Sequence, residues 1–358
     1  MKKVTIILAL MLSSVTFAQE TEAPKSTPLE ISGSGDLYYK YDFSKNENIG
    51  TSFATDQNSV SLGMLDLMLK KTTGKVSFVG ELSFGPRGQW QSIPNGDGSA
   101  DNLNNSFNIQ NLYATYAVSD KLSLTAGYMG TFIGYEVISP VANFHYSTSY
   151  LFTNGPFQNA GVKANYKITD KFGAMLGVFN DKWNNYKANT SKGLNAVGGQ
   201  LSYATEGASV YLNFMDGSVS GTIVDLTATF QLTEKFKLGL NAADFSGVIK
   251  DSGYTGFALY PSIAITEAFG LGLRGEYFMA KKGGNPYSLP LPGGAFSKVI
   301  ADESVTALTL SANYKVGGLT IIPEFRFDNG SEKFFLESDA ITTTKSAAQA
   351  TLAVVYGF

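Results

Sequence analysis

Apolar and polar residues alternate along most of the chain, most clearly in residues 222–243. Every second residue is apolar across 224–232, and the alternation resumes across 236–242 after the break Thr233-Glu234-Lys235. A period of two places the apolar residues on one face of a strand and the polar residues on the other. Two such runs joined by a short polar turn predict a β-hairpin.

The same unit repeats to the end of the chain and predicts 16 strands. Seven of their connections are tight turns, and four of these share the formula Ser/Thr, Asp/Glu, Lys or Ala, and then an apolar residue. The other eight run from spacers of about six residues to insertions of over 20. Short turns on one side and long loops on the other are typical of an outer-membrane barrel, whose periplasmic turns are short and whose external loops are long. The strands are predicted at 31–43, up to 70, 76–84, 109–118, 122–133, 160–168, 172–179, 195–203, 208–215, 224–232, 236–242, 255–265, 269–279, 305–316, 319–327 and 347–358.

Alternation alone also fits a water-soluble β-sandwich, so the choice of a membrane barrel rests on other features. The strands are about 10 residues long, as a tilted membrane strand requires. The last strand ends on Phe358, an ending that resembles the recognition signal of outer-membrane barrel proteins. Aromatic residues at the strand ends predict two girdles: Tyr166, Phe172, Phe230, Phe236, Phe269 and Tyr314 at one end, and Tyr41, Phe43, Phe84, Phe132, Phe214, Tyr277 and Phe327 at the other.

The sequence therefore predicts an all-β fold, a 16-stranded antiparallel transmembrane β-barrel formed by residues 30–358. Pro261 and Pro323 fall inside predicted strands, where a closed barrel has no free edge, so we expect bulges or strand ends there. The region of Gly63 and Asp66 also breaks the alternation.

The N-terminal residues form a separate targeting segment. Lys2 and Lys3 precede an apolar run that is too short to span a bilayer as a helix, and small residues lead to Ala18. We expect a signal peptide over 1–18, a flexible periplasmic lead over 19–29, and export to the outer membrane of a Gram-negative cell. A short N-terminal anchor is the alternative.

Composition removes several classes of site. The chain has no Cys and one His, which excludes disulfides, thiolate metal sites and a Cys nucleophile. Removing two signal-peptide lysines leaves 25 basic against 30 acidic residues, so nothing recruits nucleic acid. Residues 95–101 resemble a calcium loop, but Ser106 stands where a bidentate Glu is required. We expect no metal and no cofactor.

Sixteen strands leave an aqueous channel, whereas about eight leave an interior that side chains fill. The polar strand faces would line this channel, and their mixed signs predict weak selectivity for net charge. The pore-lining candidates are Asp36, Lys40, Asp66, Lys70, Glu81, Lys163, Lys167, Asp225, Arg274, Glu276, Glu324 and Arg326.

The third long connection, residues 134–159, has no sustained alternation and is rich in aromatic residues. A solvated loop would not carry Phe144, Tyr146, Tyr150, Phe152 and Phe157. We therefore expect this segment to pack on the lumen wall or on a neighbouring subunit.

Several stretches resemble the OmpL-like β-barrel porin family. They are Gly134-Tyr135-Glu136, Asn143, Ser149-Tyr150-Leu151-Phe152, Gly155-Pro156-Phe157, Gly161-Val162-Lys163, and an N-terminal strand with Asp36, Tyr38, Tyr39, Asp42 and Phe43. The resemblance implies an outer-membrane channel that contacts membrane lipid and small hydrophilic solutes, and that the barrel-assembly machinery reads through Phe358. Similarity to general porins implies a homotrimer and a third loop that narrows the pore. No pore residue is carried over from the family; in this chain the constriction candidates are Glu136, Asn143 and His145 of the third long connection. An outward loop that caps the barrel is the alternative.

The expected function is passive diffusion of small hydrophilic solutes and ions, without enzymatic activity. A substrate-specific channel would be favoured by an aromatic ladder of Tyr38, Tyr113, Tyr211 and Tyr260, and a barrel closed by its own loops could be an adhesin or a structural protein. His145, Ser147 and Asn159 resemble the side chains of outer-membrane phospholipase. They fall in a broken loop rather than on a lipid-facing strand, which disfavours that reading.

Overall fold

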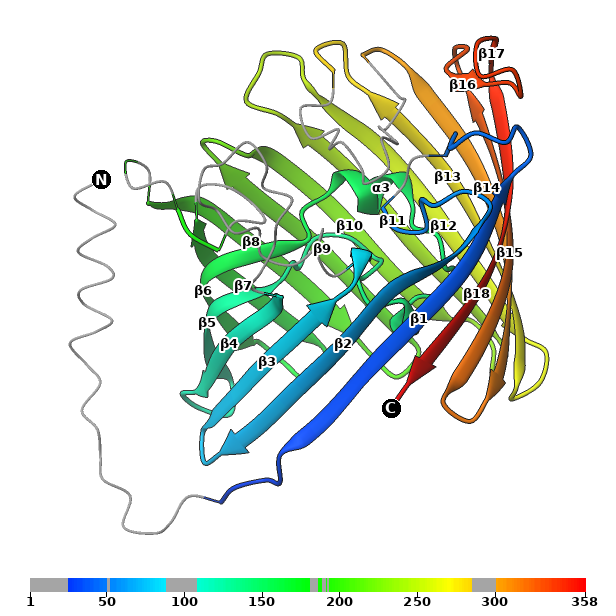
Figure 1. Cartoon of the computed structure of the whole chain (residues 1–358). Coiled ribbons are helices and arrows are strands. Elements are labelled where there is room, and N and C mark those ends of the chain that lie inside the picture. The colour runs from blue at the N-terminus through cyan, green and yellow to red at the C-terminus, as the bar shows by residue number, and fades with distance from the viewer. Residues whose placement is uncertain are drawn as a thin grey trace.

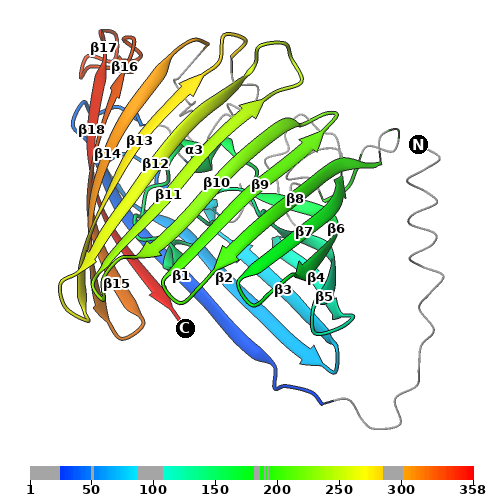
Figure 2. The same cartoon turned by 180° about the vertical axis from the view of Figure 1, so that it is seen from behind.

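The structure is a computed structural model that describes residues 25–49, 52–87, 108–180, 186–188, 191, 193–284 and 301–358. Sixteen antiparallel strands close into one barrel, which confirms the predicted fold (Figures 1 and 2). They are β1 (Glu30–Asp42), β2 (Ser59–Thr73), β3 (Val76–Phe84), β4 (Ile109–Ala117), β5 (Leu122–Gly130), β6 (Gln158–Lys167), β7 (Phe172–Asn180), β8 (Leu194–Ala204), β9 (Ala208–Gly217), β10 (Gly221–Gln231), β11 (Phe236–Ser246), β12 (Gly253–Ala264), β13 (Phe269–Ala280), β14 (Ser304–Val316), β15 (Leu319–Gly330) and β18 (Ser346–Gly357).

The two faces of the wall have opposite polarity, as a membrane barrel requires. On β15, for example, Glu324 and Arg326 are buried inside, whereas Phe325 and Phe327 are exposed outside. The same alternation leaves a band of exposed Leu, Val, Ile, Phe and Tyr side chains around the barrel. No helix in the described part of the chain is long and apolar enough to cross a membrane.

The barrel closes where its first and last strands meet. β1 pairs with β18 from Ser34 opposite Gly357 to Asp42 opposite Gln349. Gly33 and Phe358 exchange main-chain hydrogen bonds of 3.1 and 3.0 Å at the short-turn end. Part of the predicted flexible lead is also hydrogen-bonded there, because the amide of Thr27 donates to the carbonyl of Thr72 at 3.0 Å.

The expectation of bulges or strand ends at Pro261 and Pro323 is wrong. Both lie inside strands, β12 and β15, and pair with Leu238 and Leu352 on one side. On the other side the ladder is interrupted next to each proline, but its register does not shift. An antiparallel residue directs its N–H toward only one neighbouring strand, so one interrupted side accommodates the missing donor.

A register shift occurs instead between Gly35 and Leu37, where Gly63 and Met64 of β2 lie opposite Asp36. This is the region that sequence alternation marks as irregular. Two smaller predictions need correction. Phe132 is not in an outer girdle, because it follows the end of β5 and packs inside against Phe179. The connection between the predicted strands 208–215 and 224–232 is shorter than expected: it is residues 218–220 only, because β9 and β10 stay paired up to Gly217 and Gly221.

Three short elements lie in the long connections. The connection between β5 and β6 contains the 3₁₀ turn η1 (Pro140–Ala142) and the helix α3 (Tyr150–Asn154). The connection between β15 and β18 forms a small hairpin of β16 (Phe335–Leu336) and β17 (Thr343–Thr344). This hairpin stands at the long-loop end of the barrel (Figure 1).

Candidate functional site

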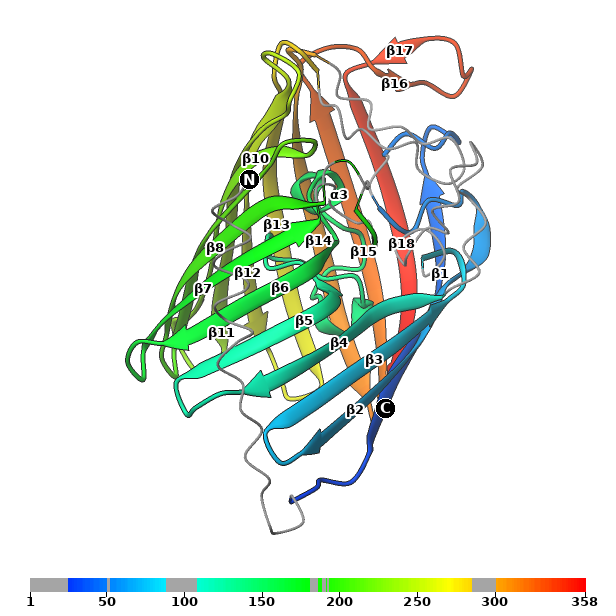
Figure 3. The same ribbon diagram turned by 90° about the vertical axis from the view of Figure 1, so that its left-hand side faces the viewer.

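Residues 131–157, here called the inward loop, fold into the barrel instead of covering its mouth. Figure 3 shows α3 within the ring of strands. Every residue from His145 to Asn154 is buried, and the side chain of Ser149 caps α3 by accepting from the amide of Phe152 at 3.0 Å. The expectation that this segment packs on the lumen wall is confirmed, and the alternative of an outward cap is wrong.

Two arginines of the wall hold the middle of the inward loop. Arg274 of β13 forms ion pairs with Glu136 of the loop at 2.8 Å and with Glu276 at 2.7 Å. It also donates to the carbonyls of Ser147 and Thr148. Arg326 of β15 donates to the carbonyl of Thr148 at 2.8 Å. Both arginine side chains are fully buried, so the loop covers residues that were expected to face the pore.

Wall carboxylates bind the amides of the same segment. Glu324 accepts from the amides of Tyr146 at 2.9 Å and Ser147 at 3.1 Å, and Glu276 accepts from the amide of Tyr150 at 2.8 Å. Removing one member of such a buried network costs about 3–5 kcal/mol, because a partner charge is left uncompensated. The charges therefore fix the loop in one position.

A second anchor lies on β1. The carboxylate of Asp36 accepts from the hydroxyl of Tyr146 and lies 3.5 Å from the guanidinium of Arg87. Arg87 in turn stacks 4.1 Å from the ring centre of Phe53. Gly63 makes room for this carboxylate, because a Cβ there would lie 1.7 Å from its Oδ2 atom.

His145, the single histidine of the chain, is buried on the inward loop, and its Nδ1 lies 2.7 Å from Oγ of Ser311. Ser311 donates to Glu324 at 2.8 Å. Burial, and then the charge of Arg274, keeps the pKa of His145 well below its ordinary value. The ring is therefore neutral at pH 7. The phospholipase-like set is not assembled in this arrangement, because the Asn159 side chain contacts Met215 instead.

Aromatic residues of the inward loop sit on glycines of the wall. Phe144 covers Gly272, where an added Cβ would lie 2.3 Å from the ring. Tyr135 covers Gly239, where an added Cβ would lie 2.2 Å from the tyrosine hydroxyl oxygen, and its ring stacks on that of Tyr260 with the ring centres 4.4 Å apart. Side chains at these positions would displace the loop, so the glycines shape its seat.

An apolar cluster occupies part of the long-loop half of the barrel. Leu151 of the inward loop joins Ile49 of the β1–β2 connection, Phe335 of the β16–β17 hairpin, and wall residues such as Phe245 and Phe278. Protein interiors of this kind pack without room for water. The part of the interior that this cluster occupies is a packed core.

The remaining pore-lining candidates divide into covered and accessible groups. Four candidates are buried and hydrogen-bonded to other parts of the protein: Lys40, Asp66, Glu81 and Asp225. Lys40 donates to the carbonyl of Thr55 at 2.6 Å, and Asp66 accepts from Ser34. Glu81 accepts from the side chains of Gln110 and Asn111, and Asp225 accepts from those of Asn213 and Asn241 and from the amide of Gly134. Lys70 and Lys167 are exposed and pair with Glu30 and Asp170. Lys163 is half-buried. Asn143, a constriction candidate, is half-buried and bonds both main-chain groups of Val137.

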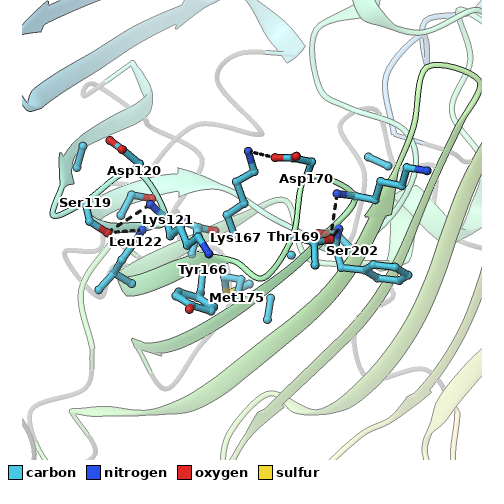
Figure 4. A pocket seen from close by; sticks show the side chains of 18 of the residues that line it. Ser119, Asp120, Lys121, Leu122, Tyr166, Lys167, Thr169, Asp170, Met175 and Ser202 are labelled. Carbon is cyan, nitrogen blue, oxygen red and sulfur yellow. Dashed lines mark hydrogen bonds and ion pairs between the residues drawn. The ribbon is translucent and has the colours of Figure 1, made fainter.

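Space for water remains in the short-turn half. A hollow of about 710 Å³ lies at the ends of β4–β8 and is lined by Asn165, Lys167, Gln200 and Ser202, among others (Figure 4). A cavity of about 260 Å³ lies against the inward loop, between Tyr135, His145 and Lys237. Another of about 300 Å³ follows toward the turns.

Sequence reasoning missed several members of this arrangement. Asp328 pairs with Arg326 at 2.8 Å, and its position two residues along the same strand face is a signal that could have found it. Arg87 lies at the start of a long connection, where no periodic pattern marks it. The described residues contain no group of three metal-ligating side chains, and the calcium-like residues 95–101 lie outside the described part.

The fold and the inward loop define an outer-membrane β-barrel of the porin type. The chain belongs to the family described as "Putative beta-barrel porin-2, OmpL-like", whose model matches residues 28–358. This confirms the resemblance found in the sequence and supports location in the outer membrane. The comparison with curated proteins gives no match.

Solved structures share the fold at low sequence identity. The outer-membrane expressed OmpT of Vibrio cholerae is 11% identical with a TM-score of 0.57, covering 95% of this chain and 99% of that one. A trimer form of in-vitro folded OmpT is 10% identical with a TM-score of 0.58, covering 93% and 99%. A triple mutant of Rh. blastica porin is 14% identical with a TM-score of 0.50, covering 92% and 100%.

Proposed function

We propose that this protein is a diffusion porin that passes small hydrophilic solutes and ions through a lumen narrowed by the inward loop. The observation that carries the proposal is the pinned loop inside a 16-stranded barrel, with polar hollows beneath it. The mechanism is passive: a wetted wall, a size limit set by the loop, and charge bias from the side chains that reach water.

Other parts of the proposal concern export and assembly. Residues 1–18 direct secretion and are cleaved after Ala18, and Phe358 is read by the barrel-assembly machinery. A homotrimer is supported by the trimer form of the fold neighbour OmpT. We propose no enzymatic activity, since the interior side chains that resemble catalytic groups serve as loop contacts.

The test is single-channel current in planar bilayers. Wild type is compared with a variant in which residues 137–147 are replaced by a short Gly-Ser linker. We expect steady open-channel steps that grow when the loop is shortened. A matched control removes residues 338–341 at the tip of the β16–β17 hairpin, where Ile341 is 83% exposed. This deletion should leave the step size unchanged.

One observation favours a second candidate, a structural barrel closed by its own loops. The apolar cluster of the long-loop half unites three connections over the lumen. If folded wild-type protein gives no steps while the shortened variant does, the closed barrel is correct and the diffusion porin is not. A specific channel has less support, because Tyr38 and Tyr260 of the expected aromatic ladder pack against the loop residues Tyr146 and Tyr135.

A further inference from the structure

We propose that the lumen selects small anionic solutes, carboxylates and phosphates, because the strand charges that reach its water are lysines. This inference rests on the proposed diffusion function. It replaces the expectation of weak selectivity, which assumed that charges of both signs on the inner wall face the pore.

The inward-facing carboxylates of the strands are withdrawn from water. From β4 round to β15 they are Asp225, Glu276, Glu324 and Asp328, and each is at most 6% exposed. They bind arginines, amide side chains or main-chain amides of the inward loop. Asp36, Asp42, Asp66 and Glu81 on β1–β3 are buried as well. Glu30 is exposed, but it pairs with Lys70 at the strand ends.

Lysines occupy the accessible part of the same wall. Lys237 of β11 and Lys315 of β14 are exposed, and Lys163 of β6 is half-buried. None of the three forms an ion pair with a described residue. Their charges are therefore not neutralised by a direct ion pair.

Three hollows of the short-turn half repeat this bias. Lys237 lines both the cavity against the inward loop and the one that follows it. In the first, the only carboxylate of the lining, Glu136, is paired with Arg274. The second holds three lysines against the turn residues Glu234 and Glu267, and the hollow at the ends of β4–β8 holds four lysines against Asp120 and Asp170. A solute that crosses these three hollows meets net positive charge, whereas a further hollow between Phe132 and Tyr211 has no charged residue in its lining.

A confined field of one sign raises the local concentration of counter-ions, because low-dielectric walls focus it. Salt screens charges over about 10 Å at 0.1 M, so the bias should be strongest in dilute salt. Lys237 lies where the loop narrows the path and should contribute most.

The experiment measures the reversal potential of the wild-type channel in a tenfold potassium chloride gradient, and then in potassium acetate. We expect a chloride-to-potassium permeability ratio above 1 that falls as salt is raised. In the variant Lys163→Glu/Lys237→Glu/Lys315→Glu the ratio should drop below 1. The single substitution Lys237→Gln, which adds no negative charge, should lower the permeability ratio part of the way. It replaces the triple variant as the test if the triple variant does not fold.

The matched control is Lys250→Glu, the same charge change on the exposed connection between β11 and β12. It should keep the wild-type ratio. Two results would overturn this inference but leave the diffusion function standing. One is a wild-type channel whose chloride-to-potassium permeability ratio is at or below 1, and the other is a permeability ratio that does not change in Lys237→Gln. Absence of steps from folded wild-type protein would overturn the diffusion function and this inference with it.

Discussion

At the scale of the residue, the interior is organised by pairs of a large side chain and a glycine, and of a charge and its counter-charge. Phe144 rests on Gly272 and Tyr135 on Gly239, while Arg274 joins the loop to the wall through Glu136. A strand pattern shows only that such residues face inward. Whether an inward residue meets water or a loop depends on contacts between distant segments.

The seat of Phe144 can be tested with one added methyl group. In Gly272→Ala the Cβ would lie 2.3 Å from Cε1 of Phe144, so the ring and the loop must move. We expect a loss of about 1–3 kcal/mol in the free energy of unfolding, typical of overpacking. Single-channel current should also change. Urea unfolding in detergent and bilayer recordings measure the two effects.

Gly275→Ala is the matched control for this prediction. Gly275 lies on the same strand but faces outward, with nothing within 4 Å of an added Cβ. It should leave both quantities near wild type. Equal effects of the two substitutions would mean that strand propensity, and not the contact with Phe144, sets the cost.

At the scale of the element, the sequence predicted every strand of the barrel, because lipid on one side and polar groups on the other impose a period of two. It did not predict how Pro261 and Pro323 are accommodated, because that depends on which neighbour each N–H would face. The inward course of the loop between β5 and β6 could be predicted from its aromatic residues. Its anchors could not, because Arg274 meets Ser147 across 127 residues of chain.

Two loops meet above the barrel seam, and their contact gives an element-scale prediction. The side chain of Asn48 donates to the carbonyl of Leu336 and accepts from its amide, each at 2.8 Å. Asn48→Ala should therefore loosen the β16–β17 hairpin, at about 0.5–1.5 kcal/mol per bond. Faster amide hydrogen exchange of Leu336 would report it.

The neighbouring Asn46→Ala removes one bond to the same hairpin, to the carbonyl of Glu337 at 2.7 Å, and should have a smaller effect. Unchanged exchange of Leu336 in Asn48→Ala would show that burial of Phe335 alone holds the hairpin.

At the scale of the whole molecule, two sets of contacts determine the shape of the lumen. The inward loop ties β13, β15 and β1 together across the interior, and the seam of β1 and β18 closes the circle. The apolar outer surface faces lipid, and the buried charged side chains bind the inward loop. Among the described strand residues that face the interior, the accessible charges lie outside the packed long-loop half, so the selectivity of the barrel does not follow from its net composition.

Phe358 closes the barrel through its main chain, and we propose that it is also the assembly signal. Mutation can separate these two roles. Deleting Phe358 removes two main-chain hydrogen bonds with Gly33, so unfolding should become easier by about 1–3 kcal/mol. Phe358→Ala keeps both bonds and should unfold near wild type in urea after refolding in detergent. If the aromatic side chain is the assembly signal, Phe358→Ala should still reduce the amount of barrel in the outer membrane of cells. Equal stability of the deletion and the alanine variant would show that the seam does not depend on its last pair, because the pairing from Ser34 to Asp42 would suffice to close the barrel.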